Sequence, residues 1–168
     1  EMGWNGFALT PDVGPRARFV SVLTTAELAP TSMYNGPKLC DPEKCKQLGG
    51  GQPLCVKVCP VAALSADGSQ RIVIAEKSFE VAKFERNRCM WASMGLSEGS
   101  LALKPVPMPD KIEITDMPAA LRKLEPSQAM EAMVIRRGDY CGKCIMECPV
   151  GRPKIVDDIV SKAKRRTS

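Results

Sequence analysis

The sequence predicts an α+β domain built from short strands, a few helices and long irregular loops. Three observations support this class. Runs of β-branched and aromatic residues are short, prolines recur through residues 97–127, and seven of the eight cysteines fall in two groups. A length of 168 residues allows one domain of ordinary size, but aromatic residues make up only 5% of it, so few large rings are available to fill a core.

The N-terminal residues predict turns followed by a strand. Gly3 and Gly6 punctuate the first turn, as glycine commonly does because it tolerates positive φ. Residues 16–24 are rich in β-branched and aromatic side chains and therefore predict a strand. Residues 31–39 form a polar connector whose Asn-Gly-Pro sequence indicates a turn.

The centre of the chain predicts a turn, a strand and a helix in succession. The Asp-Gly-Ser sequence of residues 67–69 indicates a turn. Residues 71–75 contain the β-branched run Ile-Val-Ile, which favours a short strand. Residues 79–94 predict a helix, because Phe84, Cys89 and Trp91 are among its apolar positions.

The last third of the chain predicts an irregular segment and then two helices. The five prolines within residues 97–127 prevent a long helix there, so we expect an irregular excursion over the surface with a short strand at 111–115 and a helix around 119–124. Residues 127–136 predict a helix that Ser127 caps. The amphipathic pattern of residues 154–168 predicts a final helix that ends in basic residues.

The spacing of the cysteines is the strongest indication of chemistry. One group reads C-x4-C-x9-C-x3-C-P, from Cys40 to Pro60, and the other reads C-x2-C-x3-C-P, from Cys141 to Pro149. A cysteine that follows another by three or four positions and precedes a proline is typical of the ligand loops of [4Fe–4S] clusters. Structural zinc and a set of four disulfides are the alternatives.

Eight thiolates are the number that two four-iron clusters require. In two-cluster ferredoxins the cysteine before the proline ligates the other cluster, which predicts crossed ligation in a ferredoxin-like domain with two [4Fe–4S] clusters. The first cluster then takes Cys40, Cys45, Cys55 and Cys148, and the second takes Cys59, Cys141, Cys144 and the one cysteine left over, Cys89. We expect backbone N–H groups of residues 48–51 and 142–143 to bond the sulfurs.

Charge and composition exclude several classes of function. The formal net charge of +5 falls close to zero if two clusters contribute about −2 each, and no basic run is interleaved with aromatic residues, so nucleic acid is not an expected partner. The absence of histidine excludes histidine-dependent catalysis and histidine-ligated metals within this chain. No apolar run is long enough to span a membrane, and oxygen-sensitive clusters favour a cytoplasmic location.

Several short stretches resemble one protein family. The sequences Gly-Trp-Asn-Gly at residues 3–6 and Gly-Pro-Arg-Ala-Arg at residues 14–18, which run into Val-Ser-Val-Leu-Thr at residues 20–24, look like the segment before the clusters of epoxyqueuosine reductases and related cobalamin-dependent reductive dehalogenases. The lone Cys89 between the two cysteine groups is the most specific part of the resemblance, and it implies the same crossed ligation. The first group departs from the family's C-x2-C-x2-C-x3-C-P spacing.

This resemblance implies a division of the chain and an electron path. Residues 1–30 resemble the end of a cobalamin-binding domain, and residues 31–168 correspond to the di-cluster domain, with its proline-rich excursion at 97–127. The resemblance places five residues near the corrin: Gly3, Asn5, Gly6, Arg16 and Arg18. In the family, electrons pass through the clusters to the corrin cobalt, and the catalytic acid lies upstream of the segment that this chain resembles.

Three hypotheses follow for the function. The first is the electron-delivering part of a cobalamin-dependent reductase, which needs an upstream domain or a partner chain for the catalytic pocket and a donor such as ferredoxin or flavodoxin. The second is a stand-alone di-cluster electron-transfer subunit without cobalamin. The third is a zinc-bound interaction module.

Overall fold

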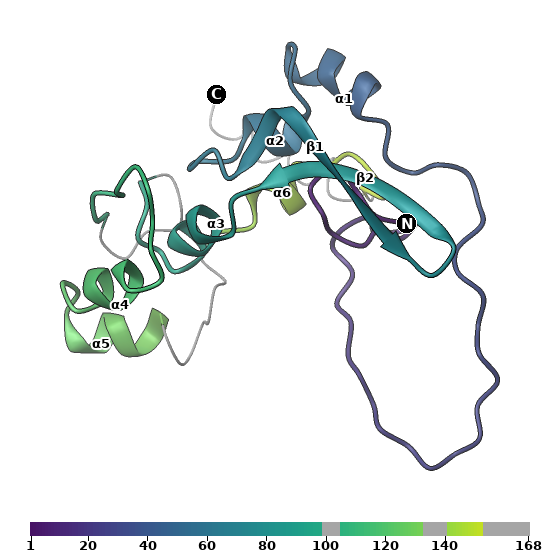
Figure 1. The fold of residues 1–168 in the computed structure, drawn as a ribbon, viewed down its shortest axis with the longest axis horizontal. Helices are drawn as coiled ribbons and strands as arrows, with labels where there is room; N and C mark the ends of the chain where they lie inside the picture. The colour runs from purple at the N-terminus through teal and green to yellow at the C-terminus, as the bar shows by residue number, and fades with distance from the viewer. Residues whose placement is uncertain (99–104, 133–140, 153–168) are drawn as a thin grey trace, which may run out of the picture.

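The computed structural model describes residues 1–98, 105–132 and 141–152, and its architecture is α+β (Figure 1). The predicted class is therefore confirmed, whereas the ferredoxin-like di-cluster arrangement stays a prediction. The described elements are α1 (Pro42–Gly49), α2 (Leu54–Lys57), β1 (Leu64–Ile74), β2 (Lys77–Phe84), α3 (Arg86–Ser93), α4 (Asp116–Leu121), α5 (Pro126–Met130) and α6 (Lys143–Met146).

Strands β1 and β2 form an antiparallel hairpin in the middle of the fold. The predicted strand at residues 71–75 lies largely within β1, but the turn predicted at residues 67–69 is wrong, because β1 continues through it with an irregular register between Leu64 and Ser69. The helix predicted from residue 79 is also wrong in its first half. Those residues pair with β1, as in Ile72 opposite Phe79, and the helix proper, α3, begins only at Arg86.

Helix α1 has clear start and stop signals. Asp41 is its N-cap, and the Asp41 carboxylate accepts the Lys44 N–H at 3.2 Å, while Pro42 occupies the first turn, where its missing N–H costs nothing. The helix ends at Gly50, whose φ of +71° lies in the left-handed region, and Gly51 follows at +102°. These two glycines reverse the chain between the second and third cysteines.

The proline-rich segment contributes to the largest apolar core instead of only crossing the surface. The core contains Trp91 of α3, Leu96 and residues of the segment itself, which are Val106, Ile112, Met117, Ala120, Leu121 and Leu124. The prediction of a surface excursion was therefore wrong for these residues. The strand predicted at 111–115 is absent, and the two helices there begin earlier than predicted, α4 at Asp116 and α5 after the N-cap Glu125 instead of Ser127. Most of the C-terminal half predicted for the second helix and the basic tail lie outside the described residues.

The first 39 residues divide into an anchored and an exposed part. Residues 1–16 form turns closed by two isolated bridges, Met2 to Ala8 and Thr10 to Gly14. Residues 18–32 are all exposed, with Val20 at 86% and Leu23 at 101% of full exposure, and they loop away from the hairpin (Figure 1). The strand predicted at residues 16–24 is wrong, because the described part of the chain offers it no strand to pair with.

Candidate metal centres

Four thiols from three stretches of sequence surround one cavity. Cys40 precedes α1, Cys45 lies within it, Cys55 lies on α2, and Cys148 follows α6. All four line a cavity of about 210 Å³, together with apolar side chains such as Leu9 and Leu48. The structure therefore brings together the four cysteines that the crossed scheme assigns to the first cluster.

Three of the other four cysteines gather around a second, apolar cluster. Cys59, Cys89 and Cys141 pack against the buried side chains of Val61, Ala63 and Ala92. Burial raises the pKa of the nearby Cys144 to about 12, and the negative charges of the three other thiols add to the shift. These are the four cysteines that the crossed scheme assigns to the second cluster.

The two groups meet between helices α2 and α6. Cys55 of the first group and Cys144 of the second both contact one apolar cluster, whose buried members include Val56, Leu64 and Ala82. The two short helices that carry them pack together. The groups are therefore neighbours, and the space between them is apolar.

Backbone N–H groups donate hydrogen bonds to several of the sulfurs. The Trp4 N–H donates to Cys40 Sγ, the Leu54 N–H to Cys45 Sγ and the Ala63 N–H to Cys59 Sγ, each at 3.2 Å. The Val150 N–H also bonds the thiol of Cys148 and lowers its pKa against the effect of burial. None of these donors lies in the two segments that we predicted from glycine content, because the fold, and not local flexibility, decides which N–H points at a sulfur.

Burial dominates the acidity of the thiols. It raises the pKa of Cys55 to about 12 and raises the pKa of Cys40, Cys89 and Cys148, with the neighbouring thiols as a further cause. Without metal, these groups hold their protons at neutral pH. Because metals bind thiolates, loading either group releases protons.

Two residues beside Cys89 fix its helix, and sequence reasoning missed both. The Asn87 side chain donates to the carbonyl of Ile112 at 2.8 Å, and the Arg88 Nε donates to the carbonyl of Val61 at 2.8 Å. These bonds attach α3 to the chain just after Cys59 and to the proline-rich segment. Two polar residues directly before a lone helical cysteine were the signal in the sequence.

The residues that the resemblance places near a corrin have different surroundings. Asn5 is buried and donates to the Cys144 carbonyl at 3.3 Å, and Gly3 lies against the Asn5 side chain. The Arg16 guanidinium donates to the carbonyls of Met146, Cys148 and Val150. Gly6 and Arg18 are exposed. Asn5 and Arg16 thus contact the cysteine loops, and corrin contacts for all five residues stay a prediction.

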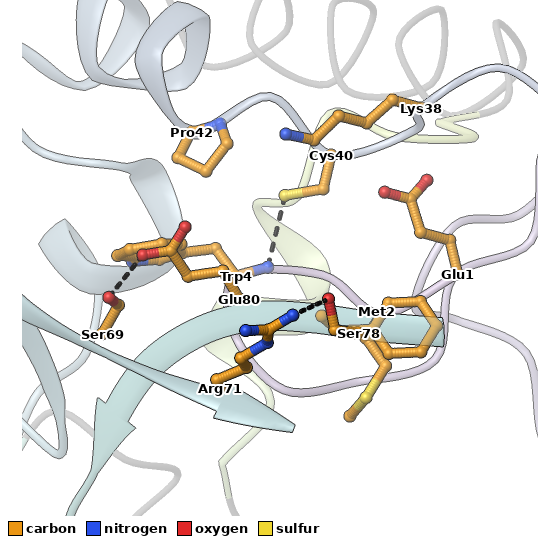
Figure 2. Close-up of a pocket in the computed structure, with 11 residues that line it drawn as sticks. Glu1, Met2, Trp4, Lys38, Cys40, Pro42, Ser69, Arg71, Ser78 and Glu80 are labelled. Atoms are coloured by element: carbon orange, nitrogen blue, oxygen red, sulfur yellow. Dashed lines mark hydrogen bonds between the residues drawn. The ribbon is translucent and has the colours of Figure 1, made fainter. Parts of the chain in front are cut away.

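A larger cavity opens on the other side of Cys40. It has a volume of about 650 Å³ and is bounded by the N-terminal turn, residues 38–42 and the hairpin. Figure 2 shows Lys38 and Glu1 on one side, Arg71 and Ser78 on the opposite side, and the Trp4 N–H bonded to Cys40 Sγ between them. The first group therefore lies next to a charged, open surface.

The arrangement of the eight thiols distinguishes among the sequence-based alternatives. All eight are free, so the disulfide alternative is wrong for this structure. Among the described residues, no three cysteine or carboxylate side chains converge on the position of a single metal ion. A zinc ion holds each thiolate at about 2.3 Å, whereas a four-iron cube separates its four ligands much more widely. The four thiols that line the cavity of about 210 Å³ would be the ligands of a cube there.

Comparisons with known proteins do not assign the chain to a family. A scan against models of protein families, a search of curated proteins and a search of solved structures each found no match. In the described parts of the chain, every helix is too short or too polar to cross a bilayer.

Proposed function

We propose that this chain transfers electrons through two [4Fe–4S] clusters. Cys40, Cys45, Cys55 and Cys148 would hold one, and the remaining four cysteines the other. The observation that supports the proposal is that Cys40, Cys45, Cys55 and Cys148 line one cavity. Cys59, Cys89 and Cys141 pack around one apolar cluster with Cys144 nearby, and each set combines residues more than 80 positions apart in sequence.

The surroundings of the thiols support this chemistry. A [4Fe–4S] cluster supplies one-electron transfer, and hydrogen bonds to its sulfurs, local charge and solvent exposure set its potential. Here the chain supplies N–H donors to Cys40, Cys45 and Cys59 and apolar side chains that keep water away from Cys55 and Cys144. The neighbouring positions of those two cysteines favour electron exchange between the groups.

We further propose that the chain is the electron-delivering part of a cobalamin-dependent reductase in the cytoplasm, with ferredoxin or flavodoxin as its donor. The resemblance of residues 3–6 and 14–24 supports this assignment. The catalytic pocket would belong to an upstream domain or a partner chain. The exposed apolar side chains within residues 18–32, which include Phe19, Val20, Val22, Leu23 and Leu28, provide a surface for contact with it, since such side chains are usually covered in a functional assembly. The alternative is a stand-alone di-cluster carrier that binds no cobalamin.

Anoxic purification followed by iron and sulfide analysis tests the cluster proposal. We expect eight irons per chain, a broad absorption near 400 nm that dithionite bleaches, and two interacting paramagnetic centres on reduction. Colourless protein that contains zinc would overturn the proposal. Mass spectrometry for co-purified corrinoid then separates the reductase from the stand-alone carrier.

A further inference from the structure

Arg16 bonds the segment that carries Cys148 through several carbonyl groups. Its Nη2 donates to the carbonyls of Met146 at 2.9 Å and Cys148 at 2.6 Å, and its Nη1 donates to that of Val150 at 3.1 Å. Met146 is the last residue of α6, where carbonyls have no partner within the helix. One guanidinium therefore fixes both the end of α6 and the residues that lead from Cys144 to Cys148.

Close backbone packing makes this contact possible. A Cβ on Gly14 would lie 2.0 Å from the Val150 carbonyl oxygen, and a Cβ on Gly151 would lie 2.2 Å from the Gly14 nitrogen. Both glycines have a φ of +58°, which side chains rarely tolerate. The backbones of residues 13–16 and 148–151 thus approach each other at a distance that only glycine permits. This close approach places Arg16 next to the segment that carries Cys148.

The guanidinium also brings a positive charge to the first group of thiols. Its acceptors in the structure are carbonyl oxygens, and these do not cancel its charge. Its Nη2 lies 2.6 Å from the carbonyl oxygen of Cys148, which places the charge beside that residue. The same charge favours any negative charge that the first group gains.

We propose that Arg16 is a positioning residue that fixes Cys148 in the first group and raises the reduction potential of the first cluster relative to the second. The inference rests on the proposed function. Reduction adds one electron to a cluster, and a nearby positive charge stabilises that form. The positioning role is separate from the effect on the potential. Cys148 is the ligand that must leave its own loop to reach the first group, and Arg16 fixes the segment that carries it.

The test compares Arg16→Gln, Arg16→Lys and, as a matched control, Arg122→Gln, which removes the same charge from an exposed side chain. Anoxic potentiometric titration followed by electron paramagnetic resonance is done in the full chain and in the Cys89→Ala background, which isolates the first centre. At a fixed potential, we expect Arg16→Gln to lower the ratio of reduced to oxidised first centre about tenfold, which corresponds to 59 mV for one electron. We expect the potential of the second centre, and both potentials of the Arg122→Gln protein, to change little.

Hydrogen exchange of the metal-free full chain tests the positioning separately. We expect amides of residues 146–151 to exchange faster in both Arg16 variants than in Arg122→Gln. In the titration, Arg16→Lys, which keeps the charge, should retain a potential near that of the unmodified chain. Equal potentials in Arg16→Gln and Arg122→Gln, equal shifts of both centres, or unchanged exchange would overturn the inference. Failure of the unmodified chain to hold two four-iron clusters would instead overturn the proposed function, and the exchange experiment would still test the positioning.

Discussion

The two groups of thiols differ in what surrounds their sulfurs. In the first group, N–H donors bond Cys40, Cys45 and Cys148, Arg16 lies close by, and a charged cavity opens beside Cys40. In the second, Ala63 donates to Cys59, and the surroundings are the apolar side chains of Val61, Ala63 and Ala92. Polar donors stabilise added negative charge, so the first centre is expected to have the higher potential and to face the redox partner.

The largest effect is expected from removing one cysteine of each group. Cys89→Ala removes a thiol from the second group, so we expect about four irons per chain and the spectrum of the first centre alone. Cys148→Ala is the matched control, because it removes a thiol from the first group. We expect the second centre to remain in this variant, although Cys148 lies only four positions after Cys144. Loss of the same centre in both variants, measured by iron analysis and paramagnetic resonance, would refute the crossed assignment.

The metal-free chain is expected to lose stability in alkaline solution. Burial raises the pKa of Cys55 and Cys144 to about 12, whereas thiols of the unfolded chain titrate near about 8.5. Between these values the unfolded chain has released protons that the folded chain retains, so the free energy of unfolding falls as pH rises. Urea denaturation at about pH 7.5 and about pH 9.5 measures the fall.

The same denaturation experiment has two controls. The double variant Cys55→Ala, Cys144→Ala should show a smaller dependence on pH, because it lacks the two thiols with the largest shifts. The cluster-loaded chain should not show this fall either, because its thiols have already lost their protons. A metal-free chain as stable at the higher pH as at the lower would contradict the burial of these thiols.

A single N–H donor to the first group is expected to have a moderate effect. Leu54→Pro removes the N–H that bonds Cys45 Sγ at the first position of α2, where proline is tolerated, and Pro53 already has the extended ψ of 139° that a following proline requires. We expect the reduction potential of the first centre to fall by about 40 mV, since one hydrogen bond is worth about 1 kcal/mol. Leu54→Ala keeps the N–H and controls for lost packing. A fall of the same size in Leu54→Ala would assign the effect to packing instead.

The smallest effect is expected from the exposed segment of residues 18–32. Val22 is 77% exposed, so Val22→Ser should change the free energy of unfolding by no more than about 0.5 kcal/mol and leave both centres intact. Thermal denaturation and iron analysis measure the two quantities. Loss of iron in this variant would mean that residues 18–32 contact the thiol groups, contrary to the structure.

The sequence predicted the α+β class but not the paths of several segments. Ligand spacing and the count of eight cysteines suggest which thiols share a centre, with the lone Cys89 assigned by elimination, and this partition stays a prediction. The strand predicted at residues 16–24 failed because propensity cannot supply a pairing partner, and the helix predicted from residue 79 failed because pairing with β1 outweighs helical spacing. Arg16 and the N–H donors were not predicted as sulfur-loop contacts, since their positions depend on contacts between distant segments.

An iron-edge anomalous difference map from crystals grown without oxygen tests the central claim most directly. We expect two four-iron peaks, one bounded by Cys40, Cys45, Cys55 and Cys148 and the other by Cys59, Cys89, Cys141 and Cys144. A four-iron peak that takes all its ligands from residues 40–59, or peaks of single ions, would contradict the account.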